Sequence, residues 1–235
     1  MTAIPYRTAL IVGAGPGISA SVARALAAAG LKVGLAARNT DKLGTLAGEI
    51  GAERFAVDAT DPAAVAHLFE TADARIGEPD VVLYNPSARA PGSVAEIDPE
   101  AVRKALEISA FGGFLVVQQA ARRMIPRGKG AILLTGASAS IKGYKLSSAF
   151  AMGKFALRGL AQSTARELGP KGIHVAHFII DGGVRSAAGG RLEPPNNPHS
   201  TLNPDDSAQT YVEVLRPPRS AWSLEVEMRP WVETF

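Results

Sequence analysis

The sequence predicts a doubly wound α/β domain, with a parallel β-sheet of about seven strands covered by helices on both faces. The first observation is that short β-branched runs alternate with longer amphipathic segments along the chain. The second is a glycine-rich stretch, VGAGPGIS, directly after the first of those runs. The third is composition: 46% apolar and 20% charged residues are typical of a globular protein with a sizeable core.

Each predicted element follows from its local pattern. Apolar, β-branched runs predict buried strands at 8–14, 32–38, 53–59, 79–85, 130–136, 172–180 and 220–228. Apolar residues at helical spacing predict helices at 17–29, 41–50, 62–76, 99–126, 147–169 and 207–215. No repeat and no linker interrupts the chain before residue 181, so we predict one domain over residues 1–235.

The composition and the periodicity of the sequence change after Ile180. The stretch DGGVRSAAGGRLEPPNNPHSTLNPDD is rich in Gly, Pro, Asn and Ser and has no periodicity. Long loops in compact domains are usually functional or mobile, so we expect 186–206 to form a substrate-side loop. The C-terminal stretch, with Trp222 and Trp231, is expected to pack on the sheet or on a neighbouring subunit.

Charge and composition exclude several classes of partner. The formal charge of +3 comes from 25 basic and 22 acidic residues that are well interspersed, which predicts no nucleic-acid partner. No apolar stretch reaches the ~18 residues that a membrane span needs, so no membrane association is expected. The chain has no cysteine, which excludes disulfides and thiolate chemistry, and no metal site is predicted. With no secretory signal pattern at the N-terminus, we expect a cytoplasmic protein.

The glycine-rich stretch predicts a phosphate-binding turn. A turn between a buried strand and a helix lets the backbone approach a pyrophosphate, and the helix N-terminus offers free N–H groups. The residues concerned are Gly13, Gly15, Pro16, Gly17 and Ile18. The alternative is a tight strand-to-helix turn without a ligand.

The end of the second strand predicts the choice of dinucleotide. An Asp or Glu there would bind the ribose 2′-hydroxyl, but the strand ends with Ala37, Arg38 and Asn39. An arginine suits a 2′-phosphate, which favours NADP, with NAD as the second choice. The alternative is a solvated arginine at the end of a strand.

Several stretches in register resemble motifs of the short-chain dehydrogenase/reductase family, whose members have a Rossmann fold. The resemblance covers about residues 7–186 and rests on the order and spacing of the motifs together. Gly13-x-x-x-Gly17-x-Ser19 is similar to TGxxxGxG, DATD (58–61) to D-x-x-D, YNPSA (84–88) to the place of NNAG, and DGGVRS (181–186) to PGxVxT.

The resemblance implies further cofactor-binding residues. Asp58 would bind the adenine amino group, and Ala59 would lie against the adenine ring. Asn85, Pro86 and Ser87 would line the site after the fourth strand, and Gly182 and Val184 would lie near the nicotinamide carboxamide.

The stretch FAMGK resembles the family's YxxxK motif with the tyrosine replaced. Lys154 matches the lysine that binds the nicotinamide ribose and lowers the pKa of the tyrosine. Phe150 matches the tyrosine itself, and a phenyl ring carries no proton to transfer. Snorkelling of Lys154 to solvent is the alternative.

The other positions of the family's proton-transfer site are also altered. The serine that orients the substrate matches Ser138 only after a small shift of the loop, and the family asparagine falls on Ser109. Tyr144 is the candidate substitute for the missing phenol, and Tyr84 is a second phenol in the region. Both tyrosines have the alternative of being half-buried loop aromatics.

These observations together predict an NADP-preferring oxidoreductase that acts on a small-molecule carbonyl or alcohol. The lost tyrosine supports a rival function, a dinucleotide-binding sensor or scaffold without redox turnover. A lyase or isomerase that uses the same pocket is the third alternative. Helices rich in Ala and Gly, at 101–120 and 147–168, predict a homodimer or homotetramer because in the resembling family such helices pair between subunits.

Overall fold

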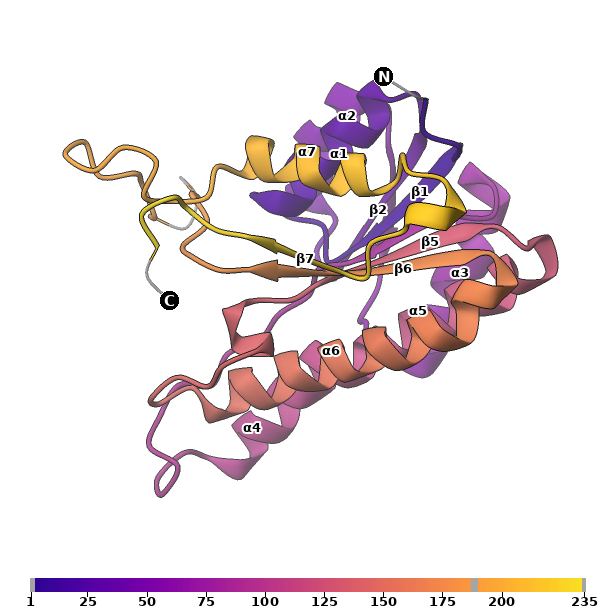
Figure 1. The fold of residues 1–235 in the computed structure, drawn as a ribbon. Coiled ribbons are helices and arrows are strands. Elements are labelled where there is room, and N and C mark those ends of the chain that lie inside the picture. The colour runs from indigo at the N-terminus through magenta and orange to yellow at the C-terminus, as the bar shows by residue number, and fades with distance from the viewer. Residues whose placement is uncertain (1–2, 187–189, 234–235) are drawn as a thin grey trace.

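The computed structural model describes residues 3–186 and 190–233. Its strands are β1 (Thr8–Val12), β2 (Lys32–Ala37), β3 (Glu53–Ala56), β4 (Val81–Tyr84), β5 (Gly130–Thr135), β6 (Ile173–Ile180) and β7 (Glu225–Met228). Its helices are α1 (Ile18–Ala28), α2 (Gly44–Ile50), α3 (Pro62–Ile76), α4 (Pro99–Leu106), α5 (Gly112–Arg127), α6 (Ser148–Leu168) and α7 (Pro204–Val214). Figure 1 shows these elements along the chain.

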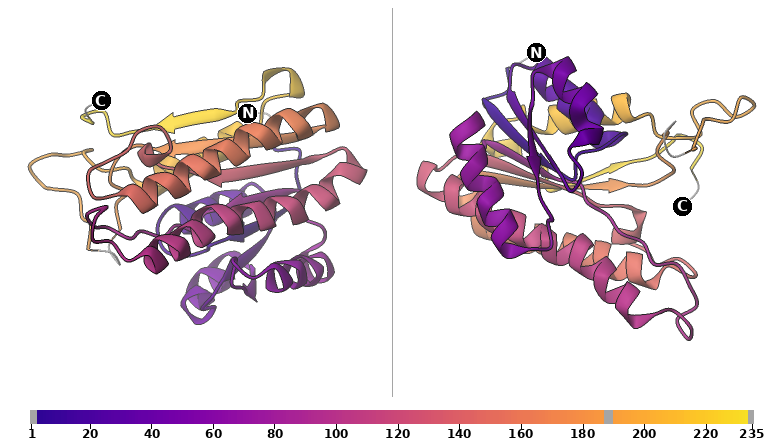
Figure 2. Two further views of the ribbon diagram at one scale, coloured as in Figure 1. Left: turned by 90° about the horizontal axis from the view of Figure 1, so that it is seen from below. Right: turned by 180° about the vertical axis from the view of Figure 1, so that it is seen from behind.

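The strands form one parallel sheet of seven in the order β3-β2-β1-β4-β5-β6-β7, which confirms the predicted fold class. Helices α1, α2 and α7 cover one face, and α3 to α6 cover the other (Figure 1). The view from below in Figure 2 shows α5 and α6 running side by side across their face. Alternate residues of each central strand enter the two cores: Ala9 and Ile11 of β1 face α1, whereas Leu10 and Val12 face α3 and α5.

Three helices begin with the same local signature, a capping side chain followed by proline. Asp61 accepts hydrogen bonds from two N–H groups at the start of α3, and Asp98 accepts one at the start of α4. Asn203 caps α7 in the same way. Proline fits the first helical position because it has no N–H to leave unpaired. This cap explains why α7 begins at Pro204, three residues before the predicted start, which shortens the predicted loop 186–206.

The predicted helix 99–126 is interrupted by a π-helical turn, Glu107–Phe111, between α4 and α5. Two close approaches flank this turn. A Cβ atom on Gly153 of α6 would lie 2.7 Å from the Cβ of Ser109, and one on Gly112 would lie 2.7 Å from the carbonyl oxygen of Ala59. Such turns are frequent at functional sites, and this one lies beside the ends of β3 and β4.

The strand order reverses between β1 and β4, which lie side by side although the chain winds outward in opposite directions from them. Ligands of open α/β sheets bind in the crevice at the carboxyl ends of such strands. No helix in the described part of the chain is both long enough and apolar enough to cross a bilayer.

Candidate active site

The glycine-rich turn between β1 and α1 has the conformation and the open space that a pyrophosphate needs. Gly13 has a φ of +81°, and a Cβ atom there would lie 2.6 Å from the backbone nitrogen of Pro86, so only glycine fits. A Cβ on Gly15 would meet no atom within 4 Å, so this part of the turn faces open space. Gly17 precedes α1 with a φ of +96° and supplies no side-chain cap. The first N–H groups of the helix are therefore available to an anion.

Ser19 stands at the third glycine position of the family motif and holds the turn together. Its buried hydroxyl accepts a hydrogen bond from the N–H of Gly15 and lies 3.0 Å from the carbonyl oxygen of the same residue. Ile18, predicted as part of the phosphate turn, is buried in the core with α1. Its role is therefore to anchor the helix start under the turn.

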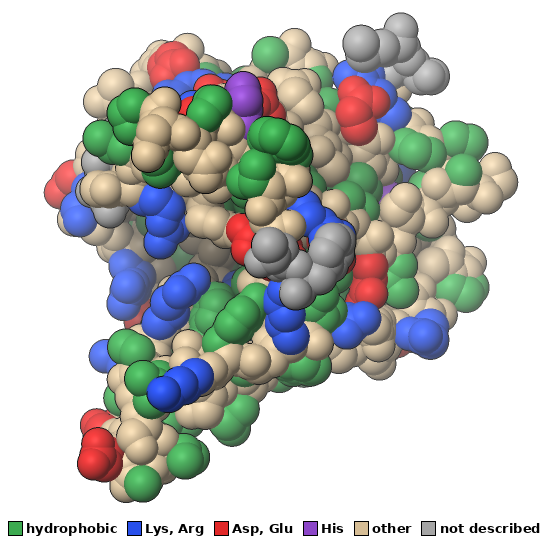
Figure 3. All heavy atoms as spheres, turned by 60° about the vertical axis from the view of Figure 1, so that its left-hand side comes forward, with side chains coloured by type: hydrophobic (Ala, Val, Ile, Leu, Met, Phe, Trp, Pro, Cys, Tyr) green, Lys and Arg blue, Asp and Glu red, His purple; other side chains and the backbone are tan. Residues whose placement is uncertain are grey.

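A cavity of about 540 Å³ lies at the carboxyl ends of β1 to β4 and brings together most of the predicted cofactor residues. The predicted residues that line it are Gly13, Gly15, Pro16, Arg38, Asn39, Asp58, Ala59, Pro86 and Ser87. Lys42 and Lys104 line it as well. Figure 3 shows Lys and Arg side chains gathered around the hollow on this side of the molecule.

Charge is distributed unevenly within the cavity. A carboxylate oxygen of Asp58 accepts hydrogen bonds from the N–H of Thr60 at 3.0 Å and from its hydroxyl at 2.8 Å. These bonds, and then the charge of Arg38, hold the pKa of Asp58 below its ordinary value. Asn39 accepts a hydrogen bond from the N–H of Asp41, which begins the turn that carries Lys42. The end of β2 is thus cationic, and the carboxylate lies at the end of β3.

A second cavity, of about 710 Å³, adjoins the first across Gly15 and Pro16. It lies between the start of α1 and the segment that follows β6, and Ser186, Leu192 and Asn203 of that segment line it. The predicted substrate-side loop therefore borders the glycine turn, although residues 187–189 of it lie outside the described residues.

Lys154 is buried on α6 and does not snorkel to solvent. Its Nζ donates a hydrogen bond of 2.8 Å to the carbonyl oxygen of Thr135, at the end of β5. Burial, and to a smaller extent the charge of Arg89, lowers the pKa of Lys154 from 10.5 to about 8. A pKa this close to neutral pH is unusual for a structural lysine and typical of a functional site.

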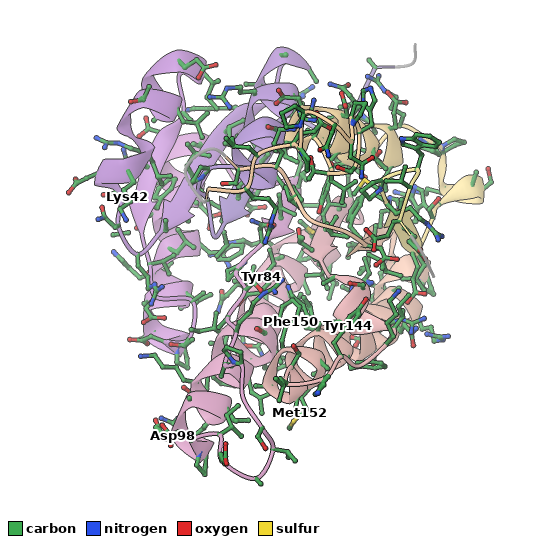
Figure 4. All side chains as sticks on the ribbon, turned by 90° about the vertical axis from the view of Figure 1, so that its left-hand side faces the viewer. Lys42, Tyr84, Asp98, Tyr144, Phe150 and Met152 are labelled. Carbon is green, nitrogen blue, oxygen red and sulfur yellow. The ribbon has the colours of Figure 1, made fainter. Side chains whose placement is uncertain are left out.

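Phe150 lies one helical turn before Lys154 with only 8% of its surface exposed. The guanidinium carbon of Arg89 lies 4.2 Å from the centroid of the Phe150 ring. Tyr144 is 45% exposed, and in the view of Figure 4 Phe150 lies between Tyr144 and Tyr84. The Nζ of Lys142 lies 5.7 Å from the Tyr144 ring centroid.

Two serines follow β5 in a short helical turn, and they differ in their surroundings. Ser138 is half-buried. Ser140 is fully buried, where its hydroxyl accepts a hydrogen bond from the N–H of Ala137 and lies 3.3 Å from Nε2 of His177. Burial lowers the pKa of His177 to about 4, so this imidazole is neutral at physiological pH. Of the two serines, Ser138 is therefore the one that remains open to a substrate.

Two other residues considered from the sequence have structural contacts. The buried Tyr84 donates its hydroxyl proton to the carbonyl of Ile108, and burial raises its pKa. Ser109 is fully buried and accepts a hydrogen bond of 3.3 Å from the N–H of Ala88. Both residues tie the loop after β4 to the π-helical turn.

Three further predicted cofactor residues, like Ile18 and Lys154, line neither of these two cavities. Asn85 donates its N–H to the carbonyl of Val12 and so joins the ends of β4 and β1. Gly182 has a φ of +139°, where a Cβ atom would lie 2.6 Å from Pro230. Val184 pairs with Leu202 in an isolated parallel bridge. These residues shape the rim at the ends of β4 and β6.

Sequence reasoning missed Lys42, Lys104 and Arg89. Lys42 could have been found as the next basic residue after Arg38, but Lys104 is one of several charges on an amphipathic helix. Arg89 follows YNPSA directly, yet only the structure shows that it lies over Phe150. No group of three or more potential metal ligands occurs among residues 3–186 and 190–233.

Comparison with known proteins identifies the family. Residues 7–195 match the model of the short chain dehydrogenase family. The chain is 34% identical over 194 residues to trans-4-hydroxycyclohexanecarboxylate dehydrogenase of Sinomonas cyclohexanicum, covering 78% of this chain and 74% of that protein. It is 26% identical over 215 residues to sorbitol-6-phosphate 2-dehydrogenase of Escherichia coli strain K12, covering 88% and 83%.

A solved structure shows the same architecture. The short-chain dehydrogenase from Rhodopseudomonas palustris has 35% sequence identity and a TM-score of 0.83, over 96% of this chain and 99% of that chain. The family model spans the glycine turn, the cavity and the segment containing Lys154. This chain therefore belongs to the short-chain dehydrogenase family of oxidoreductases.

Proposed function

We propose that this protein is an NADP-preferring oxidoreductase that interconverts an alcohol and a carbonyl compound through an altered proton-transfer site. The observation that carries the cofactor choice is that Arg38 and Lys42 line the same cavity as the glycine turn. The strand β2 ends without a carboxylate that would select a ribose 2′-hydroxyl. Two cations at this place favour a 2′-phosphate.

The residues of the cavity fit such a dinucleotide. The open space at Gly15 and the uncapped start of α1 suit a pyrophosphate, and Asp58 at the end of β3 suits an adenine amino group. Lys154 would bind the ribose hydroxyls beside the nicotinamide. When bound, a nicotinamide dinucleotide supplies the hydride chemistry, and the protein supplies orientation.

An alcohol or carbonyl substrate is supported by the family and by the names of the relatives. Two of them are dehydrogenases of hydroxy compounds, a hydroxycyclohexanecarboxylate and a sugar alcohol phosphate. In this chain Ser138 would orient the substrate oxygen. Tyr144 would be the phenol that exchanges a proton with that oxygen. A positioned acid or base contributes ~10²–10⁴ in rate, so Tyr144→Phe should slow turnover measurably.

The cofactor proposal is tested by fluorescence titration with NADPH and NADH. NADPH should bind more tightly, and Arg38→Ala should remove most of that preference because a charge-assisted hydrogen bond is worth about 10- to 100-fold in affinity. Arg7→Ala is the matched control, since Arg7 is exposed just before β1, at the opposite end of that strand. Equal affinities of the unmutated protein for both dinucleotides would contradict the assignment.

The rival function, a dinucleotide sensor or scaffold, is favoured by Phe150 at the acid position. NADPH oxidation with a panel of aldehydes and ketones separates the two. Turnover with any member of the panel supports the oxidoreductase. Tight NADPH binding without turnover would support the sensor.

We also propose that the chain forms a homodimer or homotetramer through α5 and α6. Large apolar side chains are exposed along this face at Phe111, Phe114, Met152 and Phe155, each 44–51% exposed. Phe111 and Phe114 stack on each other with ring centroids 6.4 Å apart. Large apolar side chains exposed on neighbouring helices are typical of an interaction site. Phe114→Glu should shift the mass measured by light scattering toward the monomer, whereas Leu192→Glu, at an exposed residue elsewhere, should not. A monomeric unmutated protein at micromolar concentration would contradict this proposal.

A further inference from the structure

Arg89 covers the residue that replaces the family's proton donor. It follows β4 in the stretch NPSAR, and its guanidinium carbon lies 4.2 Å from the centroid of the Phe150 ring. This separation is well within the range of a cation–π contact. The place where the family has a phenol therefore has a phenyl ring with a cation over it.

The backbone next to Arg89 is tied to α6 through Ser109. The N–H of Ala88 donates a hydrogen bond of 3.3 Å to the buried hydroxyl of Ser109. Ser109 in turn packs against α6, because a Cβ atom on Gly153 would lie 2.7 Å from its own Cβ. Phe150 and Gly153 belong to the same helix, so the arginine and the ring are carried by elements in contact with one another.

Positive charge converges on Phe150. Lys154, one turn along α6, is buried, and the charge of Arg89 acts on it. Within residues 3–186 and 190–233, the Arg89 guanidinium takes part in no ion pair or hydrogen bond that would neutralise or occupy it. A guanidinium in this state offers its hydrogen-bond donors to a ligand.

Two carboxylates, one that begins β7 and one that follows β6, pair with other cations. Glu225 accepts two hydrogen bonds from Arg158, at 2.6 and 2.8 Å, and a third from Gln162. Asp181 lies 3.7 Å from the Nζ of Lys142. Among residues 3–186 and 190–233, no carboxylate forms an ion pair or a hydrogen bond with Arg89 or Lys154.

We propose that Arg89, stacked on Phe150, binds an anionic group of the substrate, so that the substrate is a carbonyl or alcohol compound carrying a carboxylate or phosphate. The inference rests on the proposed oxidoreductase function and adds the substrate class. The planar fork of an arginine matches both groups by paired hydrogen bonds. The buried Phe150 ring supports the guanidinium from below. Arg89 does not act as the acid, because a guanidinium keeps its proton in proteins.

The test compares matched pairs of compounds that differ in charge. Acetoacetate is paired with its methyl ester, and dihydroxyacetone phosphate with dihydroxyacetone, so the two pairs separate a carboxylate from a phosphate. Binding of each compound to the complex of the protein with NADP is measured by calorimetry. In at least one pair, the anion should bind about 10- to 100-fold more tightly than its neutral partner, as expected for a charge-assisted bond.

Variants of Arg89 make the result specific. Arg89→Gln should remove the preference for the anion, and Arg89→Lys, which keeps the charge but not the fork, should retain part of it. Arg7→Gln is the control for a general loss of positive charge and should leave the preference intact. Melting curves verify that each variant is folded. If Arg89→Gln does not fold, the anion preference of Arg89→Lys is compared with that of the unmutated protein instead.

Two results would overturn the inference. One is equal binding of the anionic and neutral members of both pairs to the unmutated protein. The other is an anion preference that persists unchanged in Arg89→Gln. A failure of the proposed function gives a different result, because NADPH would then not bind or would not be oxidised. Calorimetric titration of the same compounds into the cofactor-free protein would still measure anion binding by Arg89.

Discussion

Replacing Lys154 by methionine should change the pH dependence of stability in a way that follows from its burial. The pKa of Lys154 falls from an ordinary 10.5 to about 8 in the folded protein, a difference of about 2.5. Each tenfold change in the proton equilibrium corresponds to about 1.4 kcal/mol, so the charged amine lowers the free energy of unfolding by about 3 kcal/mol below pH 8. Methionine keeps a similar length of apolar side chain without the charge.

The sign follows from proton binding. Between pH 8 and 10.5 the unfolded chain holds the proton and the folded chain does not, so the free energy of unfolding of the unmutated protein rises with pH in this window. Lys154→Met lacks this rise. The difference in free energy of unfolding between the two proteins should therefore change by about 3 kcal/mol from neutral pH to a pH above the pKa of Lys154 in the unfolded chain. The loss of the hydrogen bond to Thr135 adds a cost that does not depend on pH.

Urea unfolding of the cofactor-free protein at several pH values measures this difference. Lys171→Met is the matched control, because Lys171 is exposed and pairs with Glu167 one turn earlier in the chain. Its difference from the unmutated protein should be nearly constant with pH. A constant difference for Lys154→Met as well would refute the reasoning, since it would mean that the amine reaches water in solution.

Two other substitutions test the altered site and its packing. Phe150→Tyr should raise carbonyl reduction up to ~10²-fold, because the new hydroxyl would lie one helical turn from Lys154; NADPH oxidation measures it, and no change would show that another group is the acid. Gly112→Ala should lower the free energy of unfolding by ~1–3 kcal/mol in urea, because its Cβ would lie 2.5 Å from the Tyr84 hydroxyl. Gly159→Ala, where no atom lies within 4 Å, should be neutral or stabilising, and equal losses in the two variants would contradict the packing argument.

The fold was predictable because each element carries its own local pattern. Strands buried on both faces read as continuous apolar runs, and β6 is buried at all of its residues. The glycine turn and the cationic end of β2 were predictable for a similar reason. Both are local in sequence, and parallel strands bring their carboxyl ends to one edge of the sheet.

What the sequence did not predict depends on contacts between distant segments. The placement of Arg89 over Phe150 joins the loop after β4 to α6, and no local pattern relates the two residues. The π-helical turn depends on close approaches to α6 and to the end of β3. The pairing of Ser140 with His177 likewise joins a turn after β5 to β6, and no local sequence pattern predicts that the two residues meet.

The packing of α7 on α1 has a consequence for how the protein is made. The helix that begins at the glycine turn is covered by α7, and the hydroxyl of Ser21 donates a hydrogen bond of 2.6 Å to Asp205. A nascent chain on the ribosome exposes the glycine turn early, but the outer face of α1 stays uncovered until Val214 has emerged. Dinucleotide capture should thus come late in synthesis, and chains released before this point would expose apolar surface to chaperones and proteases without a ligand to protect them.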